Sequence, residues 1–181
     1  MLFTQTTLND AYVIEIEKKE DERGFFARSW DKKIFEKNNL ETKFVQDSVA
    51  FSKKRGTLRG MHFQLSPYEE TKLIRCTSGR IIDIIIDVRR ESNTFKKWTS
   101  VELSANNRKM IYVPKGFAHG YQTLEDDTEV YYQITQIHMP DYECGIHWND
   151  PEFSITWPIE NKIISKKDDS WSFFNSNKFS N

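Results

Sequence analysis

The sequence has few of the features that point to a membrane, a nucleic acid or an oxidising compartment. Its two cysteines, Cys76 and Cys144, are not in a CxxC spacing, so the sequence allows one disulfide but does not require it. The net charge of −1 gives no electrostatic reason to bind nucleic acid or an anionic membrane. No apolar run approaches the length of a membrane-spanning helix, and no secretory signal pattern opens the chain. We therefore expect a cytoplasmic protein without nucleic-acid or membrane partners.

Motifs for common cofactors are absent as well. There is no GxGxxG fingerprint and no Walker loop, so neither bound nicotinamide nor ATP is expected. Basic residues form only short runs, at 53–55 and 166–167, which are typical of solvated loops. Aromatic residues make up 14% of the chain and charged residues 29%, as in a soluble globular protein. The length of 181 residues suits one domain over 1–181, with a frayed tail at about 172–181.

Alternation of apolar and polar residues predicts a mainly β fold. Turn-forming residues separate the alternating segments, and regular short strands of this kind indicate a sandwich or barrel. The predicted strands are 12–17, 81–88, 98–103, 110–113, 121–124 and 128–135. In segment 81–88, Asp83 and Asp87 share one face with Ile85, which predicts a polar environment on that face. One short helix is predicted over 32–37, with Asp31 as its N-cap.

Two histidines lie beside glycines, about fifty residues apart. His62 is in segment 56–64 (GTLRGMHFQ), and His119 is in segment 114–120 (PKGFAHG). A single histidine in a β protein is more often a hydrogen-bonded structural residue than a catalytic one. Two histidines in glycine-flanked segments, accompanied by Lys72, two aspartates and Tyr132, favour a site that moves protons.

Strand periodicity places the candidate acid and base on different walls of a cavity. Tyr132 shares a face with Val130 and Ile134, apolar residues that indicate the interior, and His62 lies on another strand. Inverting a carbon next to a carbonyl needs a base on one face and an acid on the other. Neutral imidazole, with a pKa of about 6.5, suits the first task, and a phenol, with a pKa of about 10, suits the second.

Three further groups complete this chemistry. Lys72 can stabilise the enolate that forms between the two proton transfers. A carboxylate bonded to the other ring nitrogen of the base would fix its tautomer, and Asp83 and Asp168 are both candidates. An epimerase without a redox cofactor can invert only carbons that a carbonyl has acidified, so its substrate has to be a ketone.

Arginine and phenylalanine residues suggest a site for a phosphate group and a nucleotide base, although surface ion pairs and core packing are simpler explanations. Arg23 and Arg59 each precede a glycine, which suits bidentate phosphate recognition, although an isolated Arg-Gly pair more often marks a surface ion pair. Phe25 and Phe26 can stack on a base or fill the core, and the sequence alone favours the core.

Six segments of the chain form an ordered set: 21–26, 56–64, 71–76, 83–89, 114–120 and 148–158. Taken in order, they resemble the dTDP-4-dehydrorhamnose 3,5-epimerase family of nucleotide-sugar epimerases. The likeness extends from about residue 5 to about 170. The resemblance implies an all-β, cupin-type jelly roll with a few short helices, and a homodimer that exchanges N-terminal strands. It further implies cofactor-free and metal-free epimerisation of a nucleotide-diphosphate 4-keto-6-deoxyhexose at C3 and C5, for deoxysugar and surface-polysaccharide synthesis.

The resemblance also implies a role for each matching residue. His62 matches the base, Tyr132 the acid, Lys72 the lysine near the C4 oxygen, and Asp168 the carboxylate paired with the base. The residues that match substrate-binding positions are Arg23, Phe26, Gln46, Arg59, Asp83, His119 and His138. Departures from the family pattern, at Arg28, Ser48 and His138, lie at the nucleotide end.

Three other functions are compatible with parts of this sequence. The first is an epimerase that inverts only C3 or C5, on a CDP- or GDP-linked sugar. The second is a metal-dependent cupin with ligands near His62, Gln64, Glu69 and His119, which is disfavoured because glutamine is a poor transition-metal ligand. The third is a non-catalytic sugar-binding module, which would not need a lysine, a phenol and two histidines together.

Overall fold

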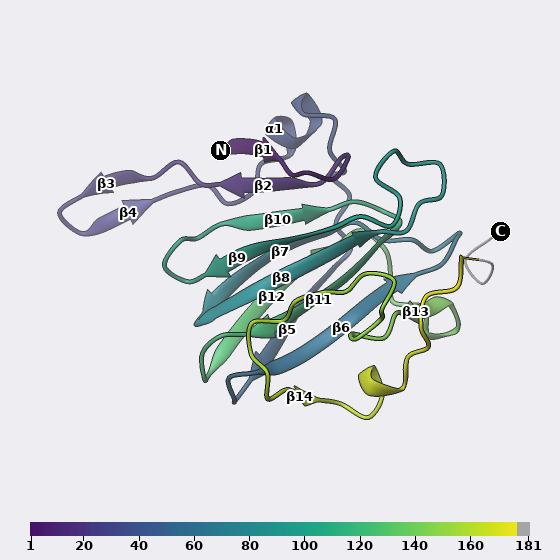
Figure 1. Ribbon diagram of the computed structural model, residues 1–181. Coiled ribbons are helices and arrows are strands. Elements are labelled where there is room, and N and C mark those ends of the chain that lie inside the picture. Colours follow the sequence, from purple (N-terminus) through teal and green to yellow (C-terminus); the bar gives the residue numbers. More distant parts are fainter. Residues whose placement is uncertain (177–181) are drawn as a thin grey trace.

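A computed structural model describes residues 1–176 and shows two facing β-sheets (Figure 1). The first sheet has the strand order β1 (Leu2–Gln5), β2 (Tyr12–Glu15), β10 (Met110–Val113), β7 (Lys72–Ser78), β12 (Thr128–Ile134), β5 (Gln46–Ser52). The second has the order β13 (Glu143–Gly145), β6 (Thr57–Gln64), β11 (Phe117–Thr123), β8 (Arg80–Asp87), β9 (Trp98–Ser104). Short β14 (Ile163–Ile164) pairs in parallel with β6, and all other pairings are antiparallel. This architecture confirms the predicted all-β sandwich.

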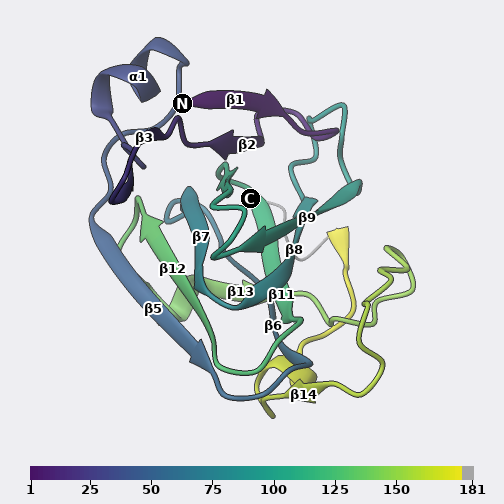
Figure 2. The same cartoon turned by 90° about the vertical axis from the view of Figure 1, so that its left-hand side faces the viewer.

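The two sheets enclose one hydrophobic core, and a further hydrophobic cluster covers the outer face of each sheet. Between the sheets, Ile85 of β8 packs with Ile74 of β7 and Val130 of β12, all fully buried. The C-terminal segment that carries β14 runs beside the second sheet (Figure 2), and Phe153 and Trp157 pack there on an outer cluster. Because these central strands are covered on both faces, several of them are apolar on both sides instead of alternating.

Helix α1 (Lys32–Lys37) covers part of the outer face of the first sheet. The side chain of Asp31 accepts a hydrogen bond from the backbone N–H of Ile34 at 3.1 Å, which confirms the predicted N-cap. Phe35 is fully buried against Tyr112 of β10 and makes an edge-to-face contact with it. Two 3₁₀ turns, Pro140–Tyr142 and Asp168–Ser170, complete the helical elements of residues 1–176.

A hairpin of β3 (Lys19–Asp21) and β4 (Gly24–Phe26) projects away from both sheets (Figure 1). Phe25 is 38% exposed and Phe26 is 68% exposed, so the expectation that they belong to the core is wrong. The strands of the hairpin pair only with each other, and the Arg108 guanidinium lies over the Phe25 ring, 4.7 Å from its centroid. We call residues 19–26 the arm.

The expected frayed tail is only partly described. Residues 172–176 run beside the second sheet, where Phe174 packs on Phe153 with ring centroids 5.4 Å apart. Residues 177–181 of the expected tail lie outside the described residues. In the part of the chain that the structure describes, no helix is long and apolar enough to cross a membrane.

Candidate active site

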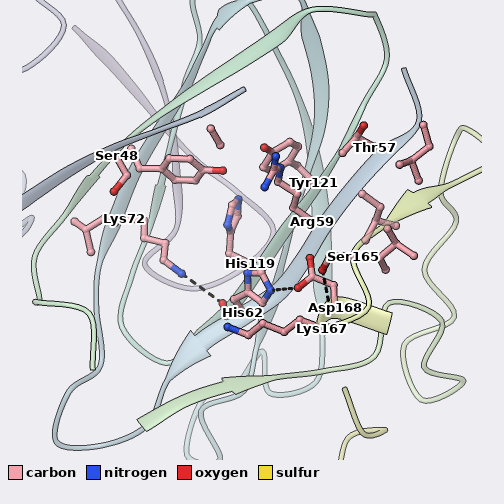
Figure 3. Close-up of a pocket in the computed structure, with 16 residues that line it drawn as sticks. Ser48, Thr57, Arg59, His62, Lys72, His119, Tyr121, Ser165, Lys167 and Asp168 are labelled. Carbon is pink, nitrogen blue, oxygen red and sulfur yellow. Dashed lines mark hydrogen bonds and ion pairs between the residues drawn. The ribbon is translucent and has the colours of Figure 1, made fainter. Parts of the chain in front are cut away.

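A cavity of about 600 Å³ lies between the two sheets and is lined from both (Figure 3). Strands β6 and β11 of the second sheet contribute Arg59, His62, His119 and Tyr121, and β7 and β12 of the first sheet contribute Lys72 and Tyr132. Asp168 and Lys167 reach the cavity from the segment after β14. The structure therefore brings all four predicted catalytic residues into one cavity.

His62 is paired with Asp168. The distance from His62 Nε2 to Asp168 Oδ1 is 2.8 Å, and the His62 side chain remains 32% exposed to the cavity. Asp168 Oδ2 accepts the backbone N–H of Gly60 at 3.3 Å, and Ser165 Oγ accepts the backbone N–H of Asp168 at 3.0 Å. Burial acts to raise the pKa of Asp168, but the hydrogen bond and charge of His62, together with the hydrogen bonds of Gly60 and Ser165, outweigh it and lower the pKa. Of the two carboxylates left open by the sequence, Asp168 is the one that orients His62.

The glycines that flank the two histidines allow their strands to pass very close together. A Cβ on Gly60, whose φ is +125°, would lie 2.5 Å from Gly120 Cα, and one on Gly120 would lie 2.6 Å from Met61 Sδ. His62 and His119 are directly opposed in the β6–β11 ladder. The glycine-flanked pattern seen in the sequence thus has a physical cause, which is the close approach of two backbones beneath the site.

His119 belongs to a second, deeper pair. His119 Nε2 lies 2.8 Å from Asp83 Oδ2, and their side chains are 6% and 0% exposed. Complete burial raises the pKa of Asp83, and the nearby His119 offsets this only in part. The polar environment predicted for this face of β8 is therefore found at Asp83, whereas Ile85 on the same face packs in the apolar core. His119 also makes an edge-to-face contact with Tyr132, with centroids 6.1 Å apart.

Tyr132 faces His62 from the opposite sheet. It lines the cavity together with Ile134, while Val130 of the same strand face is fully buried, as the alternation predicted. Burial raises the pKa of the Tyr132 phenol well above its ordinary value, and the neighbouring Tyr121 adds to the effect. A phenol in this environment keeps its proton at neutral pH and can donate it to a strongly basic carbon.

Three cations line the cavity, each with its own partner. Lys72 Nζ lies 2.8 Å from Glu70 Oε1, and Arg59 at the mouth donates to the Phe51 carbonyl at 3.1 Å. Lys167 Nζ lies 2.7 Å from both carboxylate oxygens of Glu143. The sequence analysis missed Lys167, because a run of two lysines resembles an ordinary solvated loop.

A second cavity, of about 170 Å³, adjoins the first and shares His62, Lys72 and Ile134 with it. Gln46 and His138, both predicted to bind substrate, line this smaller cavity, and Gln46 Oε1 accepts the backbone N–H of His138 at 2.7 Å. Arg23 and Phe26, also predicted to bind substrate, line neither cavity because they are on the arm. The Arg23 side chain is 82% exposed and pairs with Asp21.

The geometry disfavours the metal-dependent alternative. Gln64 Nε2 donates to the carbonyls of Tyr68 and Ile137, at 2.8 and 3.3 Å, and Gln64 Oε1 accepts the N–H of Met139 at 2.6 Å. The side-chain amide of Gln64 thus forms its hydrogen bonds with backbone groups. Among the described residues, no group of three or more histidine, cysteine or acidic side chains is placed to hold a metal ion.

A histidine–carboxylate pair facing a phenol across a β cavity is suited to the chemistry of one class of protein, the proton-transferring isomerases. A family model for dTDP-4-dehydrorhamnose 3,5-epimerase matches residues 5–176. A relative of that name from Methanothermobacter thermautotrophicus is 44% identical over 172 residues, covering 93% of this chain and 92% of the relative. The chain belongs to the dTDP-4-dehydrorhamnose 3,5-epimerase family and is an isomerase.

Solved structures support the same assignment. The Bacillus anthracis epimerase, crystallised with TDP and PPi, has a TM-score of 0.93 and 42% identity, covering 96% of this chain and 99% of that one. The Legionella pneumophila enzyme, in complex with dTDP-4-keto-L-rhamnose, has a TM-score of 0.90 and 34% identity, covering 99% and 94%. These similarities confirm the expected cupin-type jelly roll.

Proposed function

We propose that this protein epimerises a dTDP-linked 4-keto-6-deoxyhexose at C3 and C5 without a cofactor. The observation that carries the proposal is the placement of His62, held by Asp168, and Tyr132 on opposite walls of one cavity. The family membership supports the substrate class, since related proteins carry this name and one was crystallised with dTDP-4-keto-L-rhamnose. The product would enter deoxysugar and surface-polysaccharide synthesis.

The proposed reaction is two proton transfers at each carbon. The ring nitrogen of His62 that does not contact Asp168 removes the proton from the carbon next to the C4 carbonyl. The electron pair moves to the C4 oxygen, and the ammonium of Lys72 donates a hydrogen bond to the resulting enolate. Tyr132 then delivers its proton to the opposite face of that carbon. Solvent returns a proton to Tyr132 and accepts the one held by His62, so the enzyme leaves the cycle unchanged.

The nucleotide diphosphate is assigned to the cations and amides at the edges of the site. Arg59 and Lys167 line the large cavity, and both can meet phosphate oxygens. Gln46 and His138, in the smaller cavity, supply hydrogen-bonding groups for the nucleotide. In the free chain Lys167 is paired with Glu143, whose carboxylate would lie close to a bound diphosphate.

A homodimer is part of the proposal, because two residues that are expected to bind substrate are on the arm and do not line the chain's own cavity. Arg23 and Phe26 are both strongly exposed, and the arm makes no sheet with the body of the chain. The edge strand β5 also exposes Val49 and Phe51, at 61% and 48%. Exposed apolar residues on a sheet edge are usually covered by a partner. Exchange of arms between two copies would place Arg23 and Phe26 at the partner's site.

A cytoplasmic location is also proposed. Cys76 and Cys144 form no disulfide in the structure, as is usual for proteins of a reducing compartment.

One assay tests the function directly. The purified protein is incubated with dTDP-, CDP- and GDP-linked 4-keto-6-deoxyhexoses in D₂O, and deuterium at C3 and C5 is followed by NMR. We expect exchange and inversion at both carbons, fastest with the dTDP sugar. Exchange at one carbon would establish a single-position epimerase, and preference for another base would overturn the dTDP assignment. Tight binding without exchange would establish a sugar-binding module instead.

A further inference from the structure

A buried carboxylate lies beside Lys72 on the lining of the smaller cavity and takes no part in the chemistry described above. Glu70 precedes β7, and its side chain is 7% exposed, against 12% for Lys72. Glu70 Oε1 lies 2.8 Å from Lys72 Nζ, and Glu70 Oε2 accepts the backbone N–H of Gln64 at 3.1 Å. Both carboxylate oxygens are therefore used, one by the lysine of the site and the other by β6, two residues beyond His62.

We propose that Glu70 is a positioning residue that holds the Lys72 ammonium where the enolate oxygen forms. This inference rests on the function proposed above, and in particular on the role of Lys72. Glu70 itself need not touch the substrate; it acts through the lysine.

The donors of Lys72 are distributed in the way that this role needs. The ammonium carries three N–H groups: one is directed to Glu70 Oε1, and a second reaches the His62 carbonyl at 3.4 Å. Because Lys72 lines the cavity, the third is left for the substrate. A lysine head group on a flexible stem gives little stabilisation unless its position is fixed before the charge develops. One anchor of the ammonium, the His62 carbonyl, lies on β6, and the other, Glu70, is itself tied to β6 by the Gln64 N–H.

The contacts of Glu70 also explain why the partner of Lys72 is a carboxylate and not an amide. A carboxylate accepts hydrogen bonds at both oxygens, whereas a glutamine has one acceptor oxygen and one NH₂ group. With glutamine at position 70, the NH₂ group would face either the Lys72 ammonium or the Gln64 N–H, and in both cases two donors would oppose each other. Removal of the charge would also leave a buried ammonium without its counter-ion, which is unfavourable.

The plainer alternative is that Glu70 only neutralises a buried lysine and contributes to stability. The two roles differ in what they predict for turnover. A purely structural pair would lower the melting temperature without a specific effect on the chemical step. A positioning residue would lower kcat, leave KM nearly unchanged, and lose its effect once Lys72 is removed.

The test is a double-mutant cycle on the purified enzyme with the dTDP-4-keto sugar. We expect Glu70→Gln to lower kcat between about 10- and 100-fold, less than the roughly 10²–10³-fold typical of losing a stabilising donor altogether. KM should change by no more than about twofold, and in the Lys72→Met background Glu70→Gln should cause no further loss of kcat. Glu69→Gln, the same charge change at a residue that lines neither cavity, is the matched control.

Two results would overturn the inference: a folded Glu70→Gln enzyme with the kcat of the wild type, or the same loss of kcat in the presence and absence of Lys72. Glu70→Asp keeps two acceptor oxygens, so it should retain more kcat than Glu70→Gln, and it serves as the test variant if the glutamine form does not fold. A wild-type enzyme that exchanges no deuterium would instead contradict the proposed function, so the two failures can be told apart.

Discussion

Asp168 follows His62 by 106 residues in the chain, yet its Oδ1 lies 2.8 Å from the His62 Nε2 atom. The aspartate begins a 3₁₀ turn after β14, and β14 pairs in parallel with the start of β6. This short pairing brings the C-terminal segment alongside the strand that carries His62. The orientation of the proposed base therefore depends on a segment that adds only two residues to the sheet.

Replacing Asp168 with asparagine should reduce turnover strongly while leaving the protein folded. An amide cannot stabilise the imidazolium of His62, and its NH₂ group favours the wrong tautomer. We expect kcat to fall by about 10²–10⁴-fold, the usual effect of impairing a general base, with dTDP affinity within about threefold by calorimetry. Asp169→Asn is the control, since the Asp169 side chain is 56% exposed and contacts Trp148. An Asp168→Asn enzyme with normal kcat would contradict the pairing as a catalytic feature.

Activity should not depend on a bound metal ion. His62 and His119 each direct Nε2 to a carboxylate, and the Gln64 amide is committed to backbone groups. These contacts leave no convergent set of ligands at the positions of the metal-dependent alternative. We expect full turnover after dialysis against EDTA and no stoichiometric metal by elemental analysis. Stoichiometric metal together with chelator-sensitive turnover would contradict the proposed mechanism.

The arm predicts complementation between two inactive variants. If Arg23 acts at the partner's site, Arg23→Ala and His62→Ala each inactivate the homodimer, the first mainly through KM and the second through kcat. Mixing the two variants 1:1 under subunit-exchanging conditions should make about half of the dimers heterodimers, each with one of its two sites intact, so that up to about a quarter of the wild-type activity returns. Light scattering should give a dimer throughout. A monomer, or an absence of restored activity despite exchange, would show that the arm does not act in trans.

Acid should weaken the fold through Asp87, a buried aspartate outside the site. Burial acts to raise the pKa of Asp87, but hydrogen bonds from Arg89, Ser92 and Thr94 outweigh it and lower the pKa. A lowered folded-state pKa contributes stability above the unfolded value of about 4, and this stability is lost as the pH falls through the folded value. Asp87→Asn should lower the free energy of unfolding at pH 7 by on the order of 3 kcal/mol. Urea titrations should show that the difference in free energy of unfolding between the wild type and Asp87→Asn becomes smaller below pH about 4. A difference that stays constant with pH would contradict the link between Asp87 protonation and stability.

Strands with one exposed face could be predicted from the sequence more accurately than strands that are buried on both faces. Strand β12, expected over 128–135, is observed over Thr128–Ile134, because its alternation marks one polar face. Strand β11, expected over 121–124, begins at Phe117. All seven of its residues are buried, so its first half shows no alternation to detect.

In the site, the chemical roles of the residues were easier to predict from the sequence than the residues with which they interact. The chemistry of His62 and Tyr132 and their placement on different walls followed from residue type and strand period. The choice between Asp83 and Asp168 did not, because it depends on how β14 docks on β6. The pairs of Lys72 with Glu70 and of Lys167 with Glu143 were also missed. The exposure of Phe26 on the arm could not be inferred, since an exposed aromatic residue resembles a core residue in sequence.

Tyr132→Phe should separate the two proton transfers of the proposed mechanism. His62 would still remove the proton, so deuterium should still enter the substrate from D₂O. Without the phenol, the proton would return mainly to the face that it left, and exchange would become faster than inversion. NMR measures both rates on the same sample. If Tyr132 were only a structural residue, its loss would cost on the order of 1 kcal/mol of stability, and exchange and inversion would fall together. An unchanged ratio of exchange to inversion would therefore remove Tyr132 from the role of acid, whereas a raised ratio would establish that the two walls of the cavity serve opposite faces of the sugar.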